Sequence, residues 1–223
     1  MAVNKDKYTE LMAALSDKAT VVAVSKTKPK EDIEALYALG HRDFGENYVQ
    51  ELAEKQSQLA ADIRWHFIGH LQTNKVKQIA GFVYLVHGVD SLKLLQEINK
   101  QGAKLNRTIN VLLQIYIAKE ESKFGLDEAE LDSIFSNNLL EALPNICVCG
   151  LMGMASFTED DKIVRAEFKY LKSLYDKYGA LQITNSRFRF LSMGMSGDYT
   201  IALQEGSSMV RIGSLLFGTR ENK

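Results

Sequence analysis

Short apolar runs rich in β-branched residues alternate with longer amphipathic segments along almost the whole chain. The runs lie at 21–26, 42–47, 64–69, 82–89, 108–117, 146–154, 188–195 and 208–214. Each run has the length and composition of a buried β-strand, and the segments between them carry apolar residues at helical spacing. A chain that repeats strand and helix in this order is expected to form a parallel sheet covered by helices.

Eight such repeats in 223 residues predict a closed (β/α)8 barrel of the TIM type. A doubly wound open sheet is the alternative that the same alternation allows. The segment 5–18, with Tyr8, Leu11 and Leu15 on one face, predicts an additional helix before the first strand. No break in composition divides 1–223, so we expect a single domain.

The composition excludes several classes of protein. The net charge of -1 gives no basic excess with which to bind nucleic acid or an anionic membrane surface. No apolar run approaches the ~20 residues of a membrane span, and the polar N-terminus lacks the apolar core of a signal peptide. Cys147 and Cys149 are too close in sequence to cross-link a fold. We therefore expect a cytoplasmic protein without a metal site.

Barrels of this type carry their functional side chains at the carboxyl ends of the strands. Lys26 ends the first strand in phase with Val22 and Val24, which points it into the mouth of the barrel. A lysine at a strand end commonly extends to solvent. A lysine held among apolar neighbours can instead lose its proton and form a Schiff base. Spacing alone leaves both interpretations open.

A second group of residues follows the seventh and eighth strands. Ser196 and Gly197 precede a short helix, and Gly213 and Ser214 close the last strand. Loops seven and eight of a barrel often bind phosphate through backbone amides and hydroxyl groups. The alternative is structural, with Ser196 and Asp198 capping the helix and Gly213 only permitting a turn. The carboxylate of Asp198 would repel an anion unless it points away.

Arg211 shares the strand phase of Gly213 and is expected to face the barrel interior. A buried guanidinium needs an acceptor, which is either a structural ion pair or a group on a bound ligand. The histidines show no metal-ligand spacing, and His66 is interpreted as a packed strand residue. Met195 is expected to pack, in a position from which it could also touch a ligand ring.

Seven segments of the chain resemble the motifs of a known family. They are AVSKTKP (23–29), FGENYVQE (44–51), WHFIGHLQTNK (65–75), SKFG (122–125), GLMGM (150–154), SMGMSGD (192–198) and VRIGSLLFG (210–218). These motifs occur in order at predicted strand ends and span nearly the whole chain. The chain resembles the pyridoxal-phosphate homeostasis protein family, single-domain relatives of the N-terminal barrel of alanine racemase.

The resemblance implies a binding site for pyridoxal 5'-phosphate (PLP). Lys26, the lysine of AVSK, would form a Schiff base with the cofactor's aldehyde. Asn47, from FGEN, would lie beside the ring near its 3'-oxygen. Arg211 would face the pyridine nitrogen, and Met195 would pack against the cofactor.

The same resemblance implies that Ser196, Gly213 and Ser214 hold the phosphate. Position 214 is often threonine in the family, and serine keeps the hydroxyl donor. Lys75 and Lys123 are further motif lysines near the mouth, and no role is assigned to either.

An arginine at the pyridine nitrogen keeps that nitrogen unprotonated and weakens the ring as an electron sink. Racemases of this fold also take a catalytic tyrosine from a second domain, whereas this chain ends at Lys223, soon after the eighth strand. We therefore expect a monomeric, non-catalytic PLP carrier in vitamin B6 homeostasis, with PLP-dependent apoenzymes as possible recipients.

Two alternatives to the carrier remain open. One is a compact fold-type III amino-acid racemase, for which Tyr116 or His70 would be the only local choices of second acid or base. The other is a barrel that binds a different phosphorylated metabolite without a Schiff base.

Overall fold

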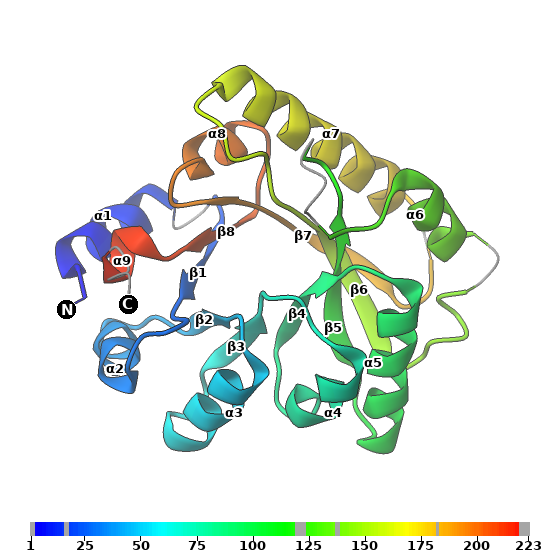
Figure 1. Cartoon of the computed structure of the whole chain (residues 1–223), viewed down its shortest axis with the longest axis horizontal. Coiled ribbons are helices and arrows are strands. Elements are labelled where there is room, and N and C mark those ends of the chain that lie inside the picture. The colour runs from blue at the N-terminus through cyan, green and yellow to red at the C-terminus, as the bar shows by residue number, and fades with distance from the viewer. Residues whose placement is uncertain (1–2, 16–17, 119–123, 137–138, 182, 219–223) are drawn as a thin grey trace.

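The structure is a computed structural model that describes residues 3–15, 18–118, 124–136, 139–181 and 183–218. Its parallel strands pair in chain order around a closed ring, with the last strand beside the first (Figure 1). The strands are β1 (Thr20–Val24), β2 (Asp43–Glu46), β3 (Arg64–Phe67), β4 (Leu85–Val89), β5 (Ile109–Ile115), β6 (Ile146–Gly153), β7 (Ser186–Met195) and β8 (Met209–Ile212). The predicted closed barrel is confirmed, and the open sheet is excluded.

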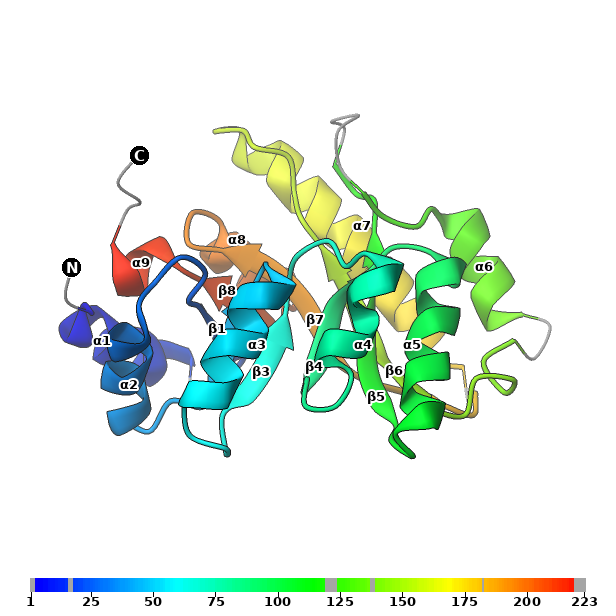
Figure 2. The ribbon, with the colours of Figure 1, turned by 60° about the horizontal axis from the view of Figure 1, so that its bottom comes forward.

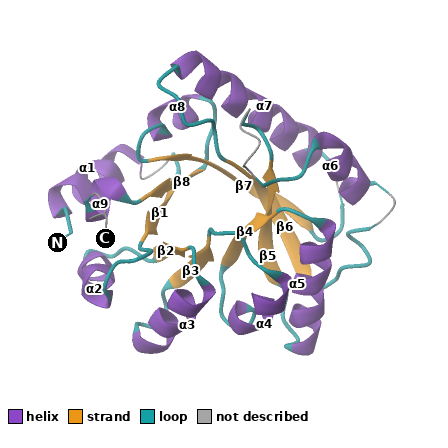
Figure 3. Cartoon of the chain, in the orientation of Figure 1, coloured by secondary structure: helices purple, strands orange, loops and turns teal. Residues whose placement is uncertain are grey.

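Helices form the outer layer around this ring of strands, as Figure 3 shows. They are α1 (Lys5–Leu15), α2 (Lys30–Ala38), α3 (Val49–Gln58), α4 (Val76–Ile79), α5 (Leu92–Lys104), α6 (Glu128–Phe135), α7 (Asp161–Gly179), α8 (Tyr199–Gln204) and α9 (Ser214–Phe217), with a 3-10 turn η1 (Thr73–Lys75) before α4. The additional N-terminal helix is confirmed as α1. Among the described residues, no helix is long and apolar enough to cross a membrane.

Two boundaries of the last repeat differ from the prediction. The strand predicted to reach residue 214 ends at Ile212, and Ser214 starts α9, a helix that the sequence analysis did not anticipate. The backbone turns here because Leu216 and Phe217 both donate their N–H groups to the carbonyl of Gly213. The new helix packs on α1, where Asn4 N–H donates to Leu216 O at 2.9 Å (Figures 1 and 2).

Other helix ends follow their local sequence. Ser91 caps α5 by accepting a hydrogen bond from Leu94 N–H, and Asp127 forms a capping box at the start of α6. The strand predicted from residue 82 begins only at Leu85. Its first residues are instead part of the turn that ends α4, because Phe82 and Val83 donate to the carbonyl of Ile79.

The interior of the barrel has an apolar part and a polar part. Six buried apolar side chains pack together in one cluster: Val22, Leu85, Leu112, Cys149, Met152 and Met209. Buried polar side chains occupy other strand positions of the same sheet, among them His66, His87, Ser192 and Arg211. Cys149 is buried, whereas Cys147 is only half-buried.

Candidate functional site

A cavity of about 490 Å³ opens where several strands of the barrel end. All the residues predicted to bind a cofactor line it: Lys26, Asn47, Met195, Ser196, Arg211, Gly213 and Ser214. They share its wall with Val24, Lys28, Ile68, Met154, Phe157, Gly197 and Gly218. The closed sheet thus brings together residues from loops that are far apart in the sequence.

Lys26 is half-buried at the wall of this cavity. The sequence analysis made it the last residue of the first strand, whereas β1 ends at Val24 and Lys26 follows two residues later. Strand-like bonding continues for one more residue, because Ser25 N–H donates to Gly45 O at 3.0 Å. The alternation of β1 therefore extends to Lys26, which faces the cavity as its phase predicted.

Charged side chains from β2 and α3, of which Glu46 and Lys55 are buried and Glu51 is half-buried, fix both neighbours of this lysine. Ser25 Oγ donates to Glu46 Oε1 at 2.6 Å, and Thr27 N–H donates to Glu51 Oε1 at 2.6 Å. Lys55 Nζ joins the two carboxylates, with bonds of 2.8 Å to Glu46 and 2.7 Å to Glu51, and also donates to Ser25 O at 2.8 Å. Glu46, Glu51 and Lys55 therefore fix the backbone on both sides of Lys26.

The loop that carries Lys26 has a strained backbone, and Glu46, the β2 residue that anchors it, has a poorly solvated carboxyl group. Thr27 has φ 63°, a left-handed conformation that a β-branched residue rarely adopts and that costs about 1–3 kcal/mol. Burial raises the pKa of Glu46 to about 7, although Lys55 and Ser25 act in the opposite direction. Within the described residues, Glu46 Oε2 has no hydrogen-bond partner. Such local costs are typical of segments whose geometry serves a function.

The loops after β7 and β8 are joined by a hydrogen bond in which Gly213 N–H donates to Ser196 Oγ at 3.2 Å. The φ of Gly213 is -116°, which any residue adopts, and an added Cβ would meet only Val24 at an ordinary 3.5 Å. Among the residues that the structure describes, an added Cβ at Gly197 would meet nothing within 4 Å. Neither glycine has a positive φ, and packing among the described residues requires neither of them, so both fit a ligand that approaches the backbone closely.

The carboxylate of Asp198 is hydrogen-bonded to the backbone, and Asp198 is not among the described residues that line this cavity. Asp198 Oδ1 accepts a hydrogen bond from Met195 N–H at 2.5 Å, and its side chain does not cap α8. The alternative in which Ser196 and Asp198 serve only to cap that helix therefore lacks the side-chain bond expected from Asp198, although Asp198 does occupy the N-cap position. Met195 itself is 40% exposed and presents its side chain to the cavity.

Arg211 is buried and faces the barrel interior, as its strand phase predicted. Its guanidinium donates to Ser192 O (2.9 Å), Ser192 Oγ (2.6 Å) and Gly153 O (3.1 Å). None of these partners, taken from the described part of the chain, is a carboxylate, so the structural ion pair is not observed. Burial lowers the pKa of Arg211 to about 10, partly offset by the charge of Asp198. The guanidinium therefore remains a cation at neutral pH.

The other residues named from the sequence lie elsewhere. His70 and Lys75 line a separate cavity of about 290 Å³ that shares Asn47 with the first. His70 Nδ1 lies 2.9 Å from Asp90 Oδ2, and its ring stacks on Phe124. Neither His70 nor Tyr116 is among the described residues that line the cavity of about 490 Å³ at the strand ends. Lys123 lies outside the described residues.

Two features of the site were not predicted from the sequence. Lys28 lines the cavity and donates to Phe217 O at 2.8 Å, which ties α9 to the β1–α2 loop. His66 is buried as expected, but it is hydrogen-bonded to Asp43 and to His87 rather than simply packed. The period-two phase of β3 and β4 could have indicated that both imidazoles point inward.

Comparisons with known proteins agree with this architecture. Residues 4–221 match the family model described as alanine racemase, N-terminal domain. The pyridoxal phosphate homeostasis protein of Aquifex aeolicus is 41% identical over 91% of this chain and 88% of its own length. The protein of that name from Synechocystis is 38% identical over 96% of this chain and 97% of its own. The human protein is 39% identical over 90% and 76%, respectively.

Solved structures give the same picture. PipY of Synechococcus elongatus, with PLP bound, is 32% identical, with a TM-score of 0.87 over 96% of this chain and 99% of its own. Alanine racemase of Bartonella henselae, 17% identical with a TM-score of 0.70 over 94% of this chain and 56% of its own, shares the barrel fold.

Proposed function

This chain belongs to the alanine racemase N-terminal domain family and, within it, to the pyridoxal phosphate homeostasis proteins, and we propose on that premise that it binds PLP and helps to balance the PLP pool. One observation carries the proposal for this chain. The cavity at the strand ends combines an amine, a buried guanidinium and a serine–glycine cradle, from Lys26, Arg211 and the loops after β7 and β8.

These groups fit the chemistry of the cofactor. When bound, PLP supplies an aldehyde that a lysine amine can hold covalently. Lys26 presents that amine from a loop whose two neighbouring residues are fixed by Glu46 and Glu51. The hydroxyls of Ser196 and Ser214 can donate to a phosphate, and the adjacent glycines leave room for it.

Arg211, Asn47 and Met195 complete the proposed contacts. Arg211 offers a charged donor to the ring nitrogen, and its own protein acceptors are neutral. A ring nitrogen that accepts from arginine is left unprotonated, which limits the ring as an electron sink. Asn47 would lie beside the 3'-oxygen, and Met195 would cover an apolar face of the ring.

The lining of the cavity favours binding over turnover. Among the described lining residues, the titratable side chains are Lys26, Lys28 and Arg211. Arg211 stays protonated, and Lys28 is bonded to Phe217 O. Racemisation needs a second acid or base near neutral pH, and none of these residues offers a histidine, tyrosine or carboxyl group. We therefore propose a non-catalytic, monomeric carrier that hands PLP to apoenzymes.

A titration of the purified protein with PLP tests the binding proposal. We expect a new absorbance band from the lysine-bound cofactor, lost in Lys26→Ala because the amine is removed. Lys30→Ala, an exposed lysine at the start of α2, is the matched control and should keep the band. A band that persists in Lys26→Ala would contradict the assignment, and Lys75 and Lys123 would be examined next.

A second measurement separates the carrier from the racemase. PLP-loaded protein is incubated with amino acids in deuterium oxide, and deuterium at Cα is followed by NMR. We expect no exchange approaching the ~1–10³ per second of ordinary enzymes, because the cavity lacks a second base. Exchange at such rates would support the racemase.

A further inference from the structure

A chain of buried polar side chains runs from this cavity toward the opposite mouth of the barrel. Arg211 Nη1 donates to Ser192 Oγ at 2.6 Å, and Ser192 Oγ lies 3.2 Å from His87 Nδ1. His87 Nε2 lies 2.9 Å from His66 Nδ1, and His66 Nε2 lies 3.0 Å from Asp43 Oδ1. Each link is within hydrogen-bond distance, so the five side chains form one continuous path.

The path crosses the barrel rather than following one strand. Its members come from β2, β3, β4, β7 and β8, and the step from His87 to Ser192 joins β4 to β7, which are not neighbours in the sheet. His66, His87 and Ser192 are completely buried. Barrel interiors of this type are usually filled by branched apolar residues. Buried polar groups in this position therefore call for a reason beyond packing.

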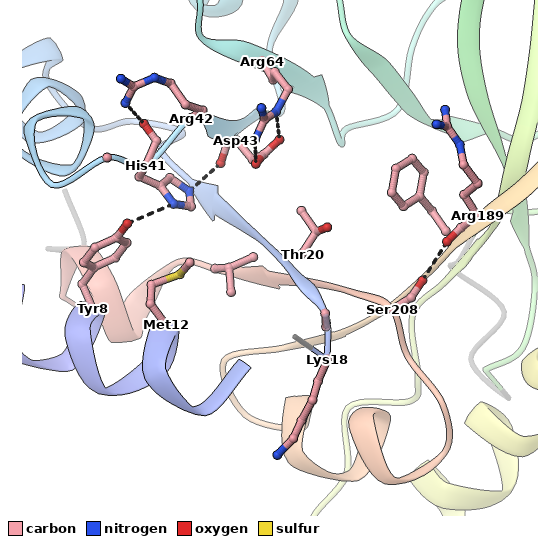
Figure 4. A pocket seen from close by; sticks show the side chains of 14 residues that line it. Tyr8, Met12, Lys18, Thr20, His41, Arg42, Asp43, Arg64, Arg189 and Ser208 are labelled. Carbon is pink, nitrogen blue, oxygen red and sulfur yellow. Dashed lines mark hydrogen bonds and ion pairs between the residues drawn. The ribbon is translucent and has the colours of Figure 1, made fainter. Parts of the chain in front are cut away.

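The end of the path at the amino-terminal mouth is a carboxylate. Asp43 lies at the start of β2, beside another cavity, which is distinct from the two described above. Figure 4 shows this cavity, with Arg64 paired with Asp43. Arg64 Nε and Nη2 donate to the two carboxylate oxygens at 2.7 and 2.5 Å. Burial would raise the pKa of Asp43, but the hydrogen bonds from Arg64 and His66 outweigh it and hold that pKa well below its usual range. Asp43 is therefore ionised and can only accept.

Because Asp43 can only accept, it determines which nitrogen of each imidazole along the path carries the hydrogen. Burial lowers the pKa of both His66 and His87, so each imidazole is neutral and carries one N–H. His66 must place its hydrogen on Nε2, facing Asp43, which leaves Nδ1 to accept from His87 Nε2–H. His87 Nδ1 then accepts from the hydroxyl of Ser192, whose oxygen accepts from Arg211. The reverse order would set a ring lone pair against the carboxylate.

We propose that Asp43, His66, His87 and Ser192 are positioning residues that act as a one-directional hydrogen-bond relay and hold the Arg211 guanidinium toward the cavity. In such a relay each bond polarises the next, so the negative end at Asp43 strengthens the acceptor that Ser192 offers to Arg211. The relay also fixes which guanidinium N–H groups are used by the protein. The others stay available to a ligand, and the identity of that ligand as PLP rests on the proposed function.

The tautomers of the ligand-free protein provide the first test. 15N NMR of protein labelled in its histidine rings distinguishes protonated from unprotonated ring nitrogens. We expect His66 and His87 each to carry hydrogen on Nε2 and a lone pair on Nδ1 near neutral pH. A hydrogen on Nδ1 of either ring, or a doubly protonated ring, would overturn the relay. This readout does not depend on whether PLP binds.

A matched pair of serine variants provides the second test. Ser192→Ala removes the link to Arg211, whereas Ser207→Ala removes a buried hydroxyl whose partners among the described residues are the backbone carbonyls of Leu191, Met193 and Met209. We expect Ser192→Ala to weaken PLP binding about tenfold, the effect of one charge-assisted hydrogen bond, and Ser207→Ala to leave it unchanged. Ser192→Thr keeps the hydroxyl and should restore most of the affinity.

The outcomes separate the relay from the proposed function. If the unmodified protein fails to bind PLP, the proposed function is wrong, and the tautomers still decide the relay. If the unmodified protein binds PLP and the affinities of Ser192→Ala and Ser207→Ala are equal, the positioning role is overturned. Loss of affinity in Ser192→Ala that Ser192→Thr restores would support it.

Discussion

Arg211 illustrates what can be predicted from sequence at the scale of one residue. Its phase with Gly213 predicted correctly that it points inward. Its acceptors could not be predicted, because Ser192 and Gly153 belong to other strands and are brought to it only by closure of the sheet. The same reason explains why His66 was interpreted as a packed residue. Strand phase predicts direction, whereas a partner depends on register across the barrel.

Cys147 gives a test at this scale. Its Sγ lies 3.8 Å from Cys149 Sγ, and the hydrogen bond from Cys149 lowers the pKa of Cys147, with Arg187 and Arg189 adding to the effect against burial. We expect the rate of alkylation of Cys147 by iodoacetamide to reach half its maximum at a lower pH than for an ordinary thiol, whose pKa is about 8.5. Peptide mass spectrometry measures that rate across pH.

The control for this thiol is Cys149→Ala, which removes the hydrogen-bond donor and should move the midpoint of Cys147 alkylation upward. A midpoint at about 8.5 in the unmodified protein, the value of an ordinary thiol, would contradict the expectation.

At the scale of elements, the order and type of every strand and of the longer helices were predictable, because period-two and helical patterns alternate clearly. Two ends were not. The turn at residues 82–83 and the helix α9 are fixed by backbone hydrogen bonds to Ile79 O and Gly213 O. Side-chain patterns carry no information on such bonds, and α9 spans only Ser214–Phe217, too short for a periodicity.

Glu46, the β2 residue that anchors the loop between β1 and α2, gives a pH test at this scale. The pKa of Glu46 in the folded protein, about 7, lies above its ordinary value of 4.5. Between these values the folded state binds more protons than the unfolded state, so stability falls as the pH rises through this range. Glu46→Gln lacks this dependence. Its free energy of unfolding relative to the unmodified protein should rise by roughly 2.5 kcal/mol from pH 5 to pH 8.

Urea unfolding at the two pH values measures this difference. Glu54→Gln, which alters an exposed carboxylate on the neighbouring helix α3, should show no comparable change. Equal behaviour of the two variants would rule out a raised pKa for Glu46.

At the scale of the whole molecule, closure of the barrel brings side chains that follow different strands together around one cavity. The cavity residues were predictable because the carboxyl ends of parallel strands meet on one face. The polar path through the interior was not, since it depends on contacts across the barrel between β4 and β7. Closure also bears on assembly, because a closed ring has no unpaired edge strand through which copies could join.

We therefore expect a monomer in solution. Sedimentation equilibrium should give a mass near the 25.0 kDa of the chain over a wide range of concentration. Twice that mass at low concentration would contradict the expectation and would indicate an interface on the helical surface.

The claim on which the account depends is that Lys26 holds the cofactor. Borohydride reduction of the PLP-loaded protein makes such a linkage permanent, and mass spectrometry of its peptides locates it. We predict a single phosphopyridoxyl group on the peptide that contains Lys26. A group on another lysine, or binding without any adduct, would contradict the account.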